Sequence, residues 1–252
     1  MNSLDEVNVN SLKVDAPEGI DIISFNDVNP KCAIISFSSM NVGQFERWTW
    51  FWKKRLSVPC VYIFLKDDEQ HYYLGTESDD LTGVRERIIS KILEKHGVPK
   101  CAAVTIGSSM GGYASIYFAH QLNLKCAISI NPQVDLESAA FHTYSLWQRK
   151  MKEVGRNWKD LDKFICNKKS KPLIYLVNGE YTPDKLAADK IDSAFRIQGH
   201  IVIRERYESE EHGWVGMNSD RLFDVVNKLL QEPRNLTSWS DIEKYIPLSL
   251  PG

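Results

Sequence analysis

Short apolar runs alternate with longer segments of helical periodicity, and this alternation constrains the fold more than any other feature of the chain. The apolar runs span residues 20–25, 32–37, 58–65, 101–106, 125–130, 173–177 and 200–204. The helical patterns span residues 45–55, 80–96, 110–122, 184–198 and 220–231. Most apolar runs are nearly continuous in aliphatic residues, which is typical of parallel strands covered on both faces. Strands joined through helices predict right-handed crossovers and a doubly wound, mostly parallel α/β sheet.

The composition is that of an ordinary globular chain, and it narrows the classes of function. With 252 residues and 43% hydrophobic content, the chain can bury one large core, so we expect a single domain over residues 1–252. The 31 basic and 33 acidic residues leave a net charge of -2, which argues against nucleic-acid binding. No apolar run approaches the roughly 18 residues of a membrane span. The polar, acidic start of the chain does not resemble a signal peptide, so we expect a cytoplasmic protein.

Sequence motifs for metals, nucleotides and disulfides are absent. The five cysteines are widely spaced and form no CxxC pair. The sequence also has no HExxH, P-loop or GxGxxG pattern. We therefore expect neither a metal ion nor a cofactor.

One stretch, residues 133–171, is much longer than an ordinary crossover helix between two strands needs. Within residues 149–171, the basic residues Arg149, Lys150, Lys152, Arg156, Lys159, Lys163, Lys168, Lys169 and Lys171 outnumber the acidic residues Glu153, Asp160 and Asp162. One interpretation is a solvated surface insertion, since charge runs usually face water. The other, which we carry forward, is a helical cap over a site that favours anionic substrates.

The most informative motif is Gly107-x-Ser109-x-Gly111, which follows an apolar run directly and precedes a helical pattern directly. In such a strand–turn–helix context the turn is so sharp that side chains at 107 and 111 would collide with backbone. The serine is held in a strained conformation with its hydroxyl exposed. In these residues the chain resembles the α/β-hydrolase fold superfamily of serine esterases and lipases. The resemblance implies α/β-hydrolase topology with Ser109 as the nucleophile.

The resemblance also implies that an acid and then a histidine follow the nucleophile, at the carboxyl ends of later strands. Among the six histidines, only His212 follows the last predicted strand and precedes the last predicted helix. We therefore expect His212 to be the general base. We favour Asp184 as the acid, with Glu180 as the first alternative and Asp135 as the second. Asp184 has an alternative role as an electrostatic cap of the helix that it begins.

An oxyanion hole is the remaining element that the resemblance implies. One donor is expected to be the backbone N–H of Met110, the residue after the nucleophile. The other is expected from residues 38–41, which follow the second apolar run. Many members of the superfamily carry His-Gly there, whereas this chain carries Ser38-Ser39, so the backbone of either Ser39 or Met40 remains a candidate.

Together these residues predict a serine hydrolase that cleaves a small-molecule carboxylic ester or thioester through an acyl-enzyme on Ser109. An acyltransferase that passes the acyl group to a sugar or another alcohol would use the same triad, because pocket shape and water access select the acceptor. The third hypothesis is an inactive binding protein with the hydrolase fold. The presence of all three residues, Ser109, Asp184 and His212, argues against it.

Overall fold

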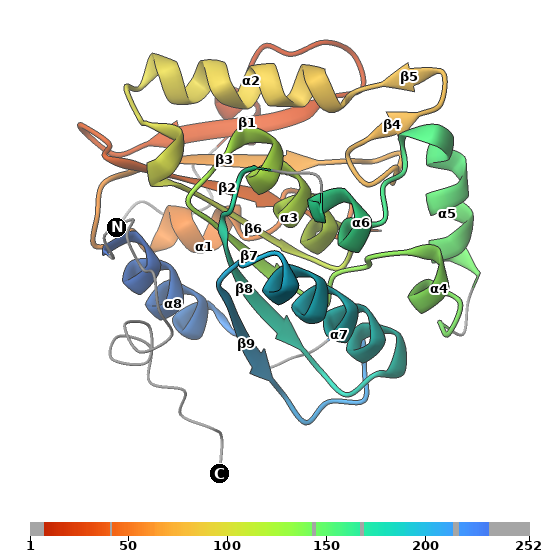
Figure 1. The fold of residues 1–252 in the computed structure, drawn as a ribbon. Coiled ribbons are helices and arrows are strands. Elements are labelled where there is room, and N and C mark those ends of the chain that lie inside the picture. Colours follow the sequence, from red (N-terminus) through yellow and green to blue (C-terminus); the bar gives the residue numbers. More distant parts are fainter. Residues whose placement is uncertain (1–7, 41, 143–144, 167–168, 214–216, 232–252) are drawn as a thin grey trace.

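A seven-stranded sheet forms the centre of the computed structural model (Figure 1). The structure describes residues 8–40, 42–142, 145–166, 169–213 and 217–231. In spatial order the strands are β1 (Asp21–Asn26), β3 (Cys60–Lys66), β2 (Cys32–Phe37), β6 (Ala103–Ser108), β7 (Cys126–Ile130), β8 (Leu173–Asn178) and β9 (Val202–Arg206). Every neighbouring pair is parallel except β1 and β3, which are antiparallel. The predicted mostly parallel α/β sheet is confirmed.

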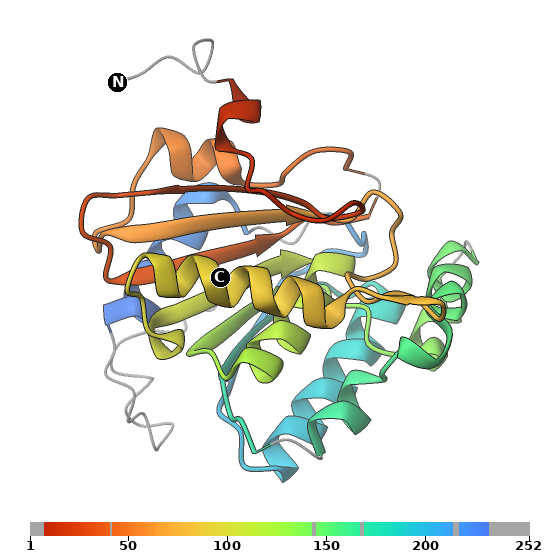
Figure 2. The ribbon, with the colours of Figure 1, turned by 90° about the horizontal axis from the view of Figure 1, so that it is seen from above.

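Helices cover both faces of this sheet, as the view from above shows (Figure 2). One face is covered by α2 (Thr82–Lys95), α3 (Met110–Leu122), α6 (Leu161–Cys166) and α7 (Thr182–Ile197). The opposite face is covered by α1 (Trp48–Lys53) and α8 (Ser219–Gln231). No helix within the described ranges has both the length and the apolarity that crossing a bilayer requires.

Strand β3 illustrates why the sequence forms a two-sided sheet. Its alternate residues Val61, Ile63 and Leu65 are buried in the core beneath α2 and α3. The intervening residues Tyr62 and Phe64 are buried in the core beneath α1 and α8. Because side chains alternate between the faces of a strand, a continuous apolar run supplies both cores at once.

The structure differs from the sequence prediction in a few local features. Each predicted strand is present with ends shifted by two residues or fewer. The helix predicted over 45–55 is shorter, because Arg47 adopts a left-handed φ of 66° and α1 begins only after it. A small hairpin of β4 (Gly75–Thr76) and β5 (Asp79–Asp80) was not predicted. Gly75 permits it, since its φ is 78° and a Cβ there would lie 2.0 Å from a backbone oxygen of Asp79.

The segment predicted as a cap, residues 133–171, divides into two parts. Helices α4 (Leu136–Ala139) and α5 (Leu146–Val154), followed by a 3-10 turn at Gly155–Asn157, lie beyond the carboxyl ends of the strands (Figure 1). Helix α6 instead packs against α3 and α7 over the sheet face. The first part alone therefore stands outside the sheet edge.

Candidate active site

Ser109 occupies the sharp turn between β6 and α3. Its φ of 54° and ψ of −119° are rare for a residue with a side chain, and such conformations persist only where the surroundings enforce them. The glycines on either side leave no space for a side chain. A Cβ on Gly107 would lie 1.9 Å from the carbonyl oxygen of Gly111, and a Cβ on Gly111 would lie 2.4 Å from that of Phe37.

Three side chains from distant parts of the chain meet at the turn between β6 and α3. Nε2 of His212 lies 2.8 Å from Oγ of Ser109. Nδ1 of His212 lies 2.8 Å and 2.9 Å from the two carboxylate oxygens of Asp184. Because a carboxylate only accepts hydrogen bonds, these contacts assign the proton to Nδ1. Nε2 is then left as an acceptor for the hydroxyl of Ser109.

Asp184 lies in the first turn of α7, with only 1% of its surface exposed. Burial raises the pKa of Asp184, and the hydrogen bond from His212 opposes that rise. The helix N-terminus also favours a negative charge at this position. Among the described residues, the imidazole of His212 is the side chain that hydrogen-bonds to this carboxylate.

Asn131, which follows β7, connects the two segments that carry His212 and Asp184. Its side-chain nitrogen donates to the backbone oxygen of His212 at 2.8 Å. Its side-chain oxygen accepts the N–H of Gly179, just before α7, at 3.1 Å. Asn131 is buried and adopts a left-handed φ of 42°, a conformation that asparagine tolerates better than most residues. No sequence pattern marks this residue, because its partners are 48 and 81 positions away.

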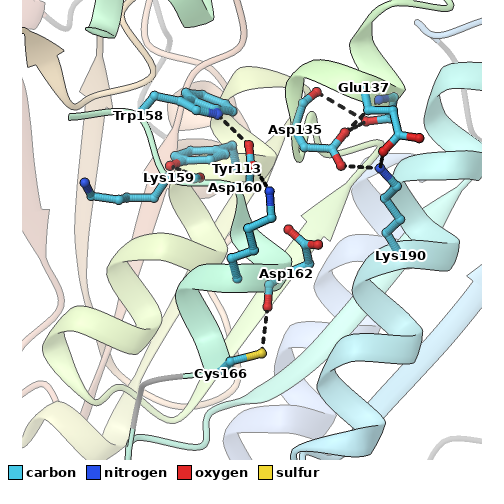
Figure 3. Close-up of polar contacts among 11 residues, drawn as sticks. Tyr113, Asp135, Glu137, Trp158, Lys159, Asp160, Asp162, Cys166 and Lys190 are labelled. Atoms are coloured by element: carbon cyan, nitrogen blue, oxygen red, sulfur yellow. Dashed lines mark hydrogen bonds and ion pairs between the residues drawn. The ribbon is translucent and has the colours of Figure 1, made fainter. Parts of the chain in front are cut away.

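The two alternative acids have other partners. Asp135 caps α4 and pairs with Lys190, which also contacts Glu137 (Figure 3). Glu180 pairs with Lys185. In the described part of the chain, neither of these acids forms a hydrogen bond with His212, and no three His, Cys, Asp or Glu side chains are arranged to hold a metal ion.

The loop after β2 lies beside the nucleophile turn. The N–H of Ser39 donates to the Glu46 carboxylate at 3.0 Å. Among the described residues, no acceptor takes the N–H of Met40 or the N–H of Met110. Asn41, the last residue of the predicted oxyanion loop, lies outside the described residues. Within the described part of the chain, the N–H groups of Met40 and Met110 are therefore free donors.

Comparisons with known proteins address the fold. No protein-family model and no curated protein matches the chain in sequence. The capsule O-acetyltransferase of Neisseria meningitidis serogroup A superposes with a TM-score of 0.66 at 13% identity, over 87% of this chain and 99% of that one. The Staphylococcus aureus fluorophosphonate-binding serine hydrolase FphF superposes with a TM-score of 0.63 at 14% identity, over 84% of this chain and 92% of that one.

A larger enzyme matches through one part of its chain. The Pyrococcus horikoshii acylaminoacyl peptidase superposes with a TM-score of 0.68 at 15% identity, over 93% of this chain but 43% of that one. This chain has the α/β-hydrolase fold. The fold predicted from the motif around Ser109 is confirmed.

In this hydrolase fold, aromatic side chains surround the imidazole of His212. The indole of Trp147 in α5 lies 4.5 Å from that imidazole, measured between ring centroids. The ring of His142 stacks on Trp147 at 3.7 Å, and its Nδ1 lies 2.8 Å from the hydroxyl of Tyr181. Burial and the neighbouring His212 lower the pKa of His142. The sequence argument did not select His142, because this residue precedes the last predicted strand, and only the placement of the insertion reveals these contacts.

The basic residues of the insertion have acidic neighbours. Arg149 and Lys150 lie 3.7 Å and 2.9 Å from the carboxylate of Glu153. Arg156 lies 3.9 Å from that of Glu77, beside the β4–β5 hairpin. The positive charge that the sequence shows is therefore partly balanced within the fold.

Proposed function

We propose that the protein is a serine hydrolase that cleaves a carboxylic ester or thioester through an acyl-enzyme on Ser109. The observation that carries this proposal is the 2.8 Å contact between Nε2 of His212 and Oγ of Ser109, at a strained turn backed by buried Asp184. A serine hydroxyl is a weak nucleophile until a neighbouring base accepts its proton. The contact provides that base in the required orientation.

The first half-reaction forms the acyl-enzyme. His212 accepts the proton of Ser109 as Oγ bonds to the acyl carbon, and Asp184 stabilises the imidazolium without taking its proton. The bond from the acyl carbon to the leaving oxygen or sulfur then breaks, and His212 gives the proton to the leaving alcohol or thiol. In the second half-reaction, water attacks the acyl carbon through the same proton transfers and Ser109 is released.

The oxyanion of each tetrahedral intermediate would be bound by backbone N–H groups. We assign the N–H of Met110 as one donor and the N–H of Met40 as the other, since neither has an acceptor among the described residues. Donors fixed in advance near a developing negative charge stabilise the transition state more than the ground state. The N–H of Ser39 is the weaker candidate because it already donates to Glu46.

Acyl transfer to an alcohol is the second candidate activity. It is favoured by the match to the capsule O-acetyltransferase, which extends over almost the full length of both chains. The aromatic side chains of α5 and its flanks around His212 would limit access of water, as a transferase requires. The two activities share the acyl-enzyme and differ only in the acceptor.

A covalent probe and a series of esters test the proposal. Wild type should react with a fluorophosphonate probe and hydrolyse p-nitrophenyl esters, tested over graded chain lengths. Ser109→Ala should abolish both, whereas Ser108→Ala should still become labelled. An unlabelled wild type would favour the inactive binding protein instead. Product analysis with and without an added sugar alcohol then separates hydrolysis from acyl transfer.

A further inference from the structure

Arg47 and Glu46 form an ion pair beside the nucleophile turn, at a point where the backbone is strained. Arg47 has a left-handed φ of 66°, which a non-glycine residue adopts at a cost unless its contacts enforce it. Only 9% of the Arg47 side chain and 20% of the Glu46 side chain are exposed. Their charged atoms, Nη1 and Oε2, lie 2.8 Å apart.

Glu46 holds the loop after β2 through several contacts. Its Oε2 accepts the N–H of Ser39 at 3.0 Å, and the hydroxyl of Ser39 lies 3.0 Å from the same oxygen. Its own N–H donates to the hydroxyl of Ser38 at 2.9 Å. The loop is therefore tied at two successive residues immediately before Met40.

Arg47 extends the same network to the residue before the nucleophile. Its Nη2 donates to the hydroxyl of Ser108. The hydroxyl of Ser39 lies 3.1 Å from the backbone oxygen of Ser108, which gives a second connection between the loop and the turn. Two segments 69 residues apart, which carry Met40 and Ser109, are thus held together through Glu46 and Arg47.

We propose that Glu46 and Arg47 are positioning residues of the oxyanion hole, which fix the distance between the N–H of Met40 and the N–H of Met110. This inference rests on the proposed acyl-enzyme function. Because Glu46 accepts the N–H of Ser39, Met40 is the described residue of this loop whose N–H has no acceptor.

The charges of the pair have a second consequence. A carboxylate so close to the site of the oxyanion would repel the negative charge that develops in the transition state. The guanidinium of Arg47 cancels that repulsion while the pair is intact. Removal of Arg47 alone should therefore be more damaging than removal of both charges, since it leaves Glu46 as an unpaired, mostly buried anion.

Four variants test the proposal by steady-state kinetics with p-nitrophenyl acetate and by affinity for an alkyl boronic acid that mimics the tetrahedral intermediate. They are Glu46→Gln, Arg47→Met, the double variant and the milder Arg47→Lys, which keeps the charge but loses the two-pronged donor. We expect kcat to fall roughly 10- to 100-fold in the single variants, because small displacements of oxyanion donors have effects of that order. KM should change little, and boronate affinity should fall in parallel with kcat. The double variant should be more active than Arg47→Met.

Asp27→Asn is the matched control. Asp27 is also a partly buried acid, paired with Arg55 at 3.5 Å, but it follows β1 at the opposite edge of the sheet. It should lose thermal stability without losing kcat or boronate affinity. If Arg47→Lys and Glu46→Gln behave like this control, the pair is only a structural brace and the proposal is wrong. Failure of wild type itself to be labelled by the fluorophosphonate would instead overturn the proposed function and this inference with it.

Discussion

The indole of Trp147 lies against two imidazoles, with its ring centroid 4.5 Å from that of His212 and 3.7 Å from that of His142. The planes of Trp147 and His142 are almost parallel, at 3°, whereas the plane of His212 is inclined at 58°. Trp147 belongs to α5 of the insertion, so a segment outside the sheet contacts the proposed base. This contact makes the insertion part of the site.

Removal of this indole should impair catalysis. We expect Trp147→Ala to lower kcat/KM about 10-fold, because His212 gains freedom to rotate away from Ser109. Trp147→Phe keeps an aromatic ring and should retain most activity. The control is Phe141→Ala, since Phe141 lies in the same insertion but is 58% exposed. Equal kcat/KM in Trp147→Ala and wild type, measured with a p-nitrophenyl ester, would show that the contact has no catalytic role.

Asp184→Asn should separate activity from stability. Loss of the charge that orients His212 should lower kcat by about 10³- to 10⁴-fold. Burial raises the pKa of Asp184 above its ordinary 3.8. The contribution of this carboxyl group to stability is therefore fully present below pH 3.8 and is lost as the pH rises through the raised pKa of the folded state. At pH 7 the buried, ionised carboxylate is therefore a cost, which the neutral amide removes. Urea denaturation at pH 7 should show a free energy of unfolding no lower than that of wild type.

Glu180→Gln provides the comparison for that experiment. Glu180 pairs with Lys185 on the surface, and its loss should leave kcat within a few-fold of wild type. The reverse pattern, an active Asp184→Asn and an inactive Glu180→Gln, would reassign the acid to Glu180.

Gly111, two residues after the nucleophile, should not tolerate a side chain. In Gly111→Ala the new Cβ would lie 2.4 Å from the backbone oxygen of Phe37, so β2 and α3 would have to separate. We expect a loss of about 1–3 kcal/mol in the free energy of unfolding, together with lower activity. Gly83→Ala is the control, because its nearest neighbour is a flexible arginine side chain at 3.4 Å and alanine favours a helix. The midpoint temperature of thermal denaturation should fall in Gly111→Ala and rise in Gly83→Ala.

The sequence predicts those parts of the molecule that depend on local patterns. The run into Ser109 and the helix after it are contiguous in sequence, so spacing alone predicts the turn between them. The strands follow from continuous apolar runs, as in β3, where alternate residues supply the two cores. The placement of His212 required one further step, the chain order that the resemblance to hydrolases implies.

Local sequence patterns do not predict contacts between segments that are distant along the chain. Asn131, Arg47 and Trp147 each reach the site through partners many positions away, and a local pattern in the sequence does not show those partners. The division of the insertion is equally hidden, because α6 packs against α3 and α7 over the sheet face, whereas α5 lies beyond the carboxyl ends of the strands. A count of the charged residues in the sequence also does not show which of them form ion pairs, as Lys150 and Glu153 do.

A histidine outside the site should make the fold sensitive to acid. Burial, with a smaller contribution from nearby Lys171, lowers the pKa of His200 from its ordinary 6.5 to about 4, and the ring of His120 packs 5.0 Å away. The unfolded chain therefore binds the proton more strongly than the folded chain between those pH values. The contribution of His200 to the free energy of unfolding is fully present above pH 6.5 and is lost as the pH falls toward 4. The loss from this group is at most about 1.4 kcal/mol per pH unit.

His200→Phe should flatten that part of the stability curve. Urea unfolding from pH 8 to pH 4 measures the difference, and the phenyl ring preserves the contacts with Phe195. Burial also lowers the pKa of His96, but this residue lies in a more exposed position at the end of α2, so His96→Phe should flatten the slope less than His200→Phe does. An identical slope in His200→Phe and wild type would assign the acid sensitivity to other groups.

The charge of the insertion predicts a preference for anionic substrates, for instance esters of acidic sugars or phosphorylated esters. Arg149 and Lys152, together with Glu153, line a shallow surface hollow on α5, and Lys152 has no ion pair among the described residues. A positive field at this hollow would concentrate anions at low salt, where the Debye length is about 10 Å, and lose its effect at 1 M, where it is about 3 Å. We therefore expect kcat/KM for an anionic ester to exceed that for a matched neutral ester at low salt, and the ratio to fall as salt rises. Reversal of Arg149 and Lys152 to glutamate should remove the preference, whereas Lys163→Glu on α6 should not. A preference for the neutral ester at every salt concentration, unchanged by the reversal, would identify the basic residues as a solvated surface.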